Sequence, residues 1–174
     1  MPGLSRDQLG REAVLVLGWF AGLGVLGGVL WWLLTPLAEW TRTAKSASMD
    51  ELNLGITVAA DGWFFVIGAV GGLLSGFVLA AWRRRDPVTT VLLLTVGAGL
   101  ASVLMYVVGH VLGPGALQES LAHARVGEKV PVPLDVAAPA VYLVWPVATL
   151  FTAVAVLWGT SDDTARVETS DLPS

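Results

Sequence analysis

The sequence predicts an all-α membrane protein with four transmembrane helices, arranged as two tandem hairpin repeats with short extended (β) segments in the outer loops. Of its 174 residues 55% are hydrophobic and only 14% are charged, whereas soluble domains carry about 25% charged residues. The few charges leave four long runs free of Asp, Glu, Lys and Arg. The chain also resembles itself when it is shifted by 78 residues.

The charge-free runs define the spans. About 20 apolar residues cross the hydrocarbon core of a bilayer, and a charge at its centre costs about 2.5–3.5 kcal/mol. Each run therefore predicts one transmembrane helix, over residues 13–34, 63–82, 88–112 and 138–158. Together they form one integral membrane domain, residues 1–160. The acidic tail that follows, residues 161–174, is expected to be disordered.

The first span is expected to be an uncleaved anchor. Arg6 and Arg11 precede an apolar run, as in a secretory signal. However, Ala38 lacks a small residue two positions earlier, where Pro36 stands, so no cleavage site follows the run closely.

The short link between spans two and three sets the orientation. It contains three consecutive arginines, Arg83, Arg84 and Arg85. Arginines next to a span favour the cytoplasmic side, where the anionic leaflet stabilises each by about 1 kcal/mol. We therefore expect the link and both termini to lie in the cytoplasm.

The self-similarity predicts two repeat units, residues 13–82 and 88–158. At a shift of 78 residues, apolar positions coincide along the whole hairpin, and Pro36 after span one meets Pro114 after span three. Both units would run in the same direction, so a pseudo-two-fold axis would lie along the membrane normal. The alternative is a chance alignment of low-complexity apolar sequence.

Two segments ahead of the even-numbered spans alternate with period two, residues 52–58 and 130–136. This pattern is typical of extended chain with one apolar face. The two segments would either pair with each other or cap the bundle. Pro131 and Pro133 remove N–H donors from one edge, so pairing must use the opposite edge.

The outer loops also carry helix signals. Apolar residues recur at helical spacing in the second loop, at Leu117, Leu121 and Ala124. Gly127 would stop this helix, and Ser48 with Glu51 has the spacing of a capping box.

Glycines at four-residue spacing predict close helix packing. Span one carries Gly18 with Gly22, as well as Gly24 with Gly28, and span two carries Gly68, Gly72 and Gly76. Such stripes let helix backbones approach closely in lipid. Because a hairpin holds spans one and two together, we expect these two spans to pack on each other. The alternative is a homodimer face or a docking groove for a partner.

Two other residue types have structural interpretations. Pro146 lies within span four and cannot bond to the carbonyl of Tyr142, so a kink is expected there. It would be a gate hinge, a polar notch for a ligand, or a tolerated transmembrane proline. The Trp residues cluster at span ends and are expected to anchor the interfaces, with Trp31, Trp32 and Trp40 outside and Trp82 and Trp158 inside.

The sequence offers little chemistry. It has no Cys and two His, and no catalytic, cofactor-binding or metal-binding constellation emerges. His110 near the outer end of span three is either a relay or ligand-binding group or an interfacial hydrogen-bonding residue. Asp61 is either a cation or partner contact or the N-cap of span two. Glu39 would pair with Asp61 as two carboxylates or form an ion pair with Arg42.

Several segments resemble a group of small actinobacterial membrane proteins catalogued as a domain of unknown function. They are residues 58–64, the Arg-rich link ending at Asp86-Pro87, residues 112–115 and residues 143–146. The resemblance covers about residues 13–158. It implies a plasma-membrane location and supplies no activity, cofactor or catalytic residue.

These observations favour a non-enzymatic accessory or interaction subunit that binds the lipid bilayer and a protein partner or a second copy of itself. Nucleic acid is not an expected partner, since the net charge is −4. The alternative is a small transporter of apolar or amphipathic molecules, with Trp145 and Pro146 lining a cavity between the repeats. An intramembrane enzyme is the least favoured class.

Overall fold

The structure of the protein is a computed structural model that describes residues 6–42, 47–48, 51–82, 87–115 and 117–170. It is mainly helical, with one small sheet. Its elements in chain order are α1 (Arg6–Leu34), β1 (Glu39–Arg42), β2 (Ala47–Ser48), α2 (Glu51–Trp82), α3 (Pro87–Leu112), α4 (Leu117–His123), β3 (Lys129–Pro131), the 3-10 helix η1 (Pro139–Leu143) and α5 (Val144–Ser170).

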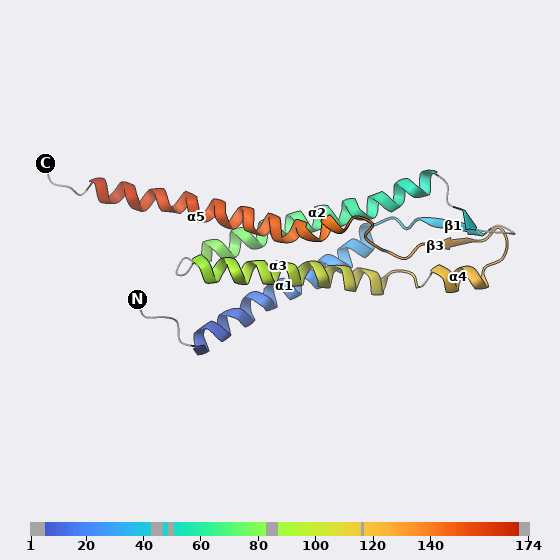
Figure 1. Ribbon diagram of the computed structural model, residues 1–174, viewed down its shortest axis with the longest axis horizontal. Coiled ribbons are helices and arrows are strands. Elements are labelled where there is room, and N and C mark those ends of the chain that lie inside the picture. Colours follow the sequence, from blue (N-terminus) through green and yellow to red (C-terminus); the bar gives the residue numbers. More distant parts are fainter. Residues whose placement is uncertain (1–5, 43–46, 49–50, 83–86, 116, 171–174) are drawn as a thin grey trace.

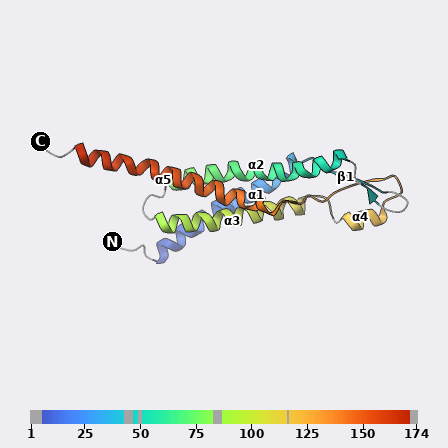
Figure 2. The same ribbon diagram turned by 45° about the horizontal axis from the view of Figure 1, so that its top comes forward.

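The four long helices form an elongated bundle, and β1, β2, β3 and α4 lie at one end of it (Figure 1). We call β1, β2, β3 and α4 the cap. Helix α1 begins, and helix α5 ends, at the end of the bundle opposite the cap (Figures 1 and 2).

All four predicted spans are present as helices long and apolar enough to cross a membrane. They cover Gly10–Leu34, Val58–Trp82, Val88–Leu112 and Pro139–Gly159. Helices α1 and α3 both end two residues before a proline, Pro36 and Pro114, because the residue before a proline disfavours helical geometry. The chain is therefore a multi-pass membrane protein.

The expected partnership of spans one and two is wrong. Helix α1 packs mainly against α3, and α2 packs mainly against α5. A Cβ placed on Gly24 or Gly28 of α1 would lie 2.7–2.8 Å from a backbone oxygen of α3. Glycine therefore lets α1 pack closely against α3, although no single loop connects these two helices. A hairpin keeps two helices near each other, but close packing depends on where the small residues face.

The predicted stripe of α2 packs on α5 instead of α1. A Cβ on Gly72 would lie 2.7 Å from the carbonyl oxygen of Trp145, and one on Gly76 would overlap the carbonyl oxygen of Thr149. Gly68 is less constrained, since its nearest neighbour would be 3.8 Å away.

Gly18 and Gly22 of α1 have a different environment from the other predicted packing residues. A Cβ at either position would meet no atom within 4 Å. The two glycines lie on the side of α1 away from α3 and are exposed. They do not contribute to packing among the residues that the structure describes.

Large side chains fill the interior of the bundle. Those that are almost fully buried include Phe20, Trp31, Phe64, Met105 and Trp145. The Trp145 ring lies against α2, where a Cβ on Gly71 would be 2.7 Å from it. Trp145 is thus a core residue and not the wall of a cavity. Trp31 is also buried and is no interface anchor, whereas Trp82 and Trp158 are exposed as expected.

A kink was expected at Pro146, but the helix changes its type two residues earlier. The span starts as η1 and changes to α-helix at Val144, so Pro146 lies in the first turn of α5. The Tyr142 carbonyl, which Pro146 cannot serve, accepts a hydrogen bond of 2.9 Å from the Ser102 hydroxyl of α3. The Ser102 side chain therefore replaces the backbone donor that Pro146 lacks, at the place where the polar notch was expected.

The two alternating segments fold differently. Residues 52–58 lie inside α2, so the extended segment predicted there is wrong. Residues 129–131 form β3, which pairs antiparallel with β1, with Val130 opposite Trp40. The predicted pairing of the two segments with each other is therefore wrong, and only the second belongs to the cap. Pro131 and Pro133 exclude a helix there, whereas no proline interrupts residues 51–61.

The pairing edge of the second segment agrees with the prediction. The N–H of Val132 donates to the carbonyl of Ala38 at 2.8 Å, on the edge that the prolines leave intact. In the cap, β1 lies between β2 and β3.

The helix predicted in the second outer loop is confirmed as α4, and Gly127 follows it with a positive φ of 89°. The capping box of Ser48 and Glu51 depends on side chains outside the described residues. At the other chain end, α5 continues to Ser170, so residues 161–170 are helical where disorder was expected. No Gly or Pro interrupts them, and extending a formed helix needs no new nucleus.

Candidate functional site

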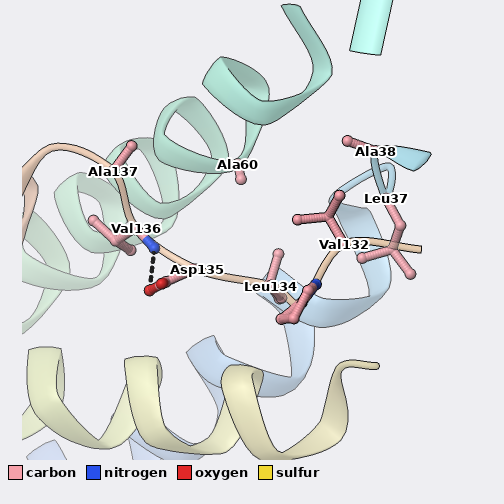
Figure 3. Close-up of a pocket in the computed structure, with 9 residues that line it drawn as sticks. Leu37, Ala38, Ala60, Val132, Leu134, Asp135, Val136 and Ala137 are labelled. Atoms are coloured by element: carbon pink, nitrogen blue, oxygen red, sulfur yellow. Dashed lines mark hydrogen bonds between the residues drawn. The ribbon is translucent and has the colours of Figure 1, made fainter. Parts of the chain in front are cut away.

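Polar side chains gather where the cap meets the bundle. The chain between β3 and η1, residues 132–138, crosses this junction between α2 and α3 (Figure 3). We call it the strap. Side chains of both helices bind it, so the strap joins the cap to the bundle.

Asp61 of α2 holds one end of the strap. Its two carboxylate oxygens accept hydrogen bonds from the N–H groups of Ala137 and Ala138, at 2.9 and 3.0 Å. Asp61 lies ten residues after the first residue of α2, so the expected N-cap role in that helix is wrong. Ala138 is the N-cap residue of η1. The carboxylate thus satisfies amides at the start of the fourth span from a different helix.

His110 of α3 holds the middle of the strap. Its Nδ1 lies 2.8 Å from the carbonyl oxygen of Leu134. A carbonyl only accepts hydrogen bonds, so Nδ1 must carry the proton, and the lone pair of a neutral ring is on Nε2. The ring also stacks on Tyr106, with centroids 5.4 Å apart. The interpretation of His110 as an interfacial hydrogen-bonding residue agrees with these contacts.

Asp135 is a functional candidate that the sequence interpretation missed. Its Oδ1 accepts hydrogen bonds from the Tyr106 hydroxyl at 3.1 Å and from the N–H of Val136 at 2.8 Å. Within the described part of the chain, Oδ2 has no hydrogen-bond partner. The signal in the sequence that could have identified Asp135 is its position as an acidic residue at the end of an apolar segment, directly before a span.

Aromatic rings pack together on the bundle side of the junction. The Trp31 and Phe64 centroids are 5.1 Å apart, and Tyr142 lies 5.5 Å from both Phe64 and Tyr106. The Trp31 indole N–H donates to the carbonyl of Ala60 at 2.8 Å. These contacts tie α1, α2, α3 and η1 together beneath the strap, and edge-to-face pairs each contribute about 0.5–1.5 kcal/mol.

An open pocket of about 220 Å³ lies between the strap, α2 and the start of β1. Eight of its nine lining residues are apolar, and the ninth is Asp135. Figure 3 shows the methyl group of Ala60 opposite Leu134 and Val132, and the carboxylate of Asp135 pointing away from Ala60. The lining residues are Leu37, Ala38, Ala60, Val132, Pro133, Leu134, Asp135, Val136 and Ala137.

A proline explains why the pocket opens here. If the register of β1 and β3 continued past the bond between Val132 and Ala38, Leu134 would lie opposite Pro36. Pro36 has no N–H to donate, so the ladder cannot extend. His110 binds the Leu134 carbonyl instead. The strap and the segment that precedes β1 therefore separate, and the pocket lies in the gap between them.

The remaining polar candidates lie apart from this junction. Glu39 forms an ion pair with Lys129, 2.9 Å between Nζ and Oε2, while Asp61 binds the strap, so the two carboxylates act separately. The Arg42 side chain and residues 83–86 lie outside the described residues. Over the described ranges, no group of three His, Cys, Asp or Glu could hold a metal ion.

Comparisons with protein-family models, with curated proteins and with solved structures find no match to this chain. The resemblance to small actinobacterial membrane proteins therefore stays a prediction. The assignment of function rests on the geometry of the bundle, the strap and the pocket.

Proposed function

We propose that the protein is a non-enzymatic accessory or interaction subunit of the plasma membrane, and that its cap is the surface that contacts a partner. The observation that carries the proposal is the fixation of the strap. The Asp61 carboxylate accepts a hydrogen bond from the strap, and Tyr106 and His110 donate hydrogen bonds to it, which connects the strap to two helices of the bundle. A cap attached in this way is preorganised, which lowers the entropy lost on binding.

The interior of the bundle favours this role over transport. Transporters typically bind their substrates near the bilayer midplane, between repeats. Here the Trp145 ring, expected to line such a cavity, is 2% exposed and packs against α2. The pocket lies instead where the cap meets the bundle. Eight of its nine lining residues lie outside the candidate spans, and only Ala60 lies within one.

We propose that the cap faces outward and that both termini are cytoplasmic. The three arginines of the link between α2 and α3 support this orientation. The end of α2 and the start of α3 lie at the end of the bundle opposite the cap, as do the start of α1 and the end of α5 (Figure 1). The chain has no native Cys, so single Cys residues at Arg84 and Ser46 can be tested with an impermeant thiol reagent. We expect labelling in intact cells at position 46 only, and labelling at position 84 alone would reverse the orientation.

We also propose that the two hairpins arose by tandem duplication. The close contacts between α1 and α3 support it, because Gly24 faces Ala101 and Gly28 faces Met105. Each pair is 77 residues apart, one less than the shift that aligns the sequence with itself. Equivalent helices would therefore pack on each other around a pseudo-two-fold axis along the membrane normal.

Site-specific photo-crosslinking in native membranes tests the subunit proposal. A photoreactive residue at Val126, exposed in the cap, should give one discrete protein adduct. The matched control is Phe151, equally exposed on the face of α5. We expect no such adduct from position 151, and stoichiometric co-purification of the same partner in mild detergent. Adducts from both positions, or from neither, would contradict the proposal.

A further inference from the structure

We draw no further inference here: the strongest candidate, the open apolar pocket between the strap, α2 and residues 37–38, carries none, because the carboxylate of Asp135 points away from Ala60 toward Tyr106 of α3 and nothing in the structure shows what covers the pocket.

Discussion

The bundle and the cap are held together by different interactions. In the bundle, glycines bring α1 against α3 and α2 against α5, and large rings fill the interior. At the strap, single polar residues hold backbone groups, and in the cap an ion pair bridges β1 and β3. Lipid tails are as apolar as Leu side chains, so helices within the membrane associate through close packing. The cap lies beyond the spans, where hydrogen bonds and charges replace packing as the main determinants.

If close packing stabilises the bundle, a side chain too large for the interface between α2 and α5 should cause the largest loss of stability. Replacing Gly72 with Leu would force its side chain into the Trp145 carbonyl and the Ala148 methyl group. We expect a loss of about 3 kcal/mol, because overpacking in a tight interface displaces backbone. Unfolding of the purified protein in mixed SDS micelles measures the change.

The matched control for Gly72→Leu is Gly22→Leu, whose new side chain would meet open space. Its unfolding free energy should stay within about 0.5 kcal/mol of the natural chain. Equal destabilisation by both changes would contradict the pairing of α2 with α5. Loss of an oligomer in Gly22→Leu alone would assign the exposed face of α1 to a homodimer.

A second prediction concerns the hydrogen bonds that join the two regions. Asp61→Ala leaves the amides of Ala137 and Ala138 without acceptors, and we expect a loss of about 1–2 kcal/mol. Hydrogen exchange is the more specific measurement. The two amides should exchange at least about tenfold faster, while the amides of α3 keep their rates. Uniform acceleration through the bundle would mean that Asp61 supports the whole fold.

Ser102→Ala is expected to have a smaller effect, about 1 kcal/mol, because it leaves the Tyr142 carbonyl unbonded at the start of α5. A double-mutant cycle isolates the cause. Pro146→Ala restores an N–H that can serve the same carbonyl, so Ser102→Ala should cost less in that background. Equal costs in both backgrounds would show that the serine acts through another contact.

The smallest effect is expected at the surface of the cap. The ion pair of Lys129 and Glu39 is exposed, and such pairs contribute about 0–1 kcal/mol. Lys129→Met should lower stability by about 0.5 kcal/mol in 0.02 M salt and by less in 0.5 M salt, where the charges are screened. Gly72→Leu should show no such salt dependence, and this difference separates the two regions experimentally.

Features that depend on local composition could be predicted from the sequence. The charge-free runs predicted the four spans, and Pro36 and Pro114 marked the ends of α1 and α3. Apolar residues at helical spacing predicted α4. Each of these signals lies within the element that it describes.

Features that depend on a distant partner could not be predicted. Nothing in the glycine spacing of α2 distinguishes α1 from α5 as its neighbour. The alternation of residues 52–58 resembles that of 130–136, but only the second segment contains the prolines that exclude a helix. Asp61 looked like an N-cap because its actual partners, Ala137 and Ala138, lie 76 and 77 residues away.

The pairing of α1 with α3 also bears on biogenesis. When the first hairpin has entered the membrane, α1 and α2 contact each other little, and their principal partners have not yet been synthesised. At about 5–20 residues per second, the matching part of the second hairpin emerges roughly 4–16 s later. During that interval the glycine faces of α1 and α2 remain open to lipid. The first hairpin therefore has to wait in the membrane, or be held by the insertion machinery, until the second one completes the fold.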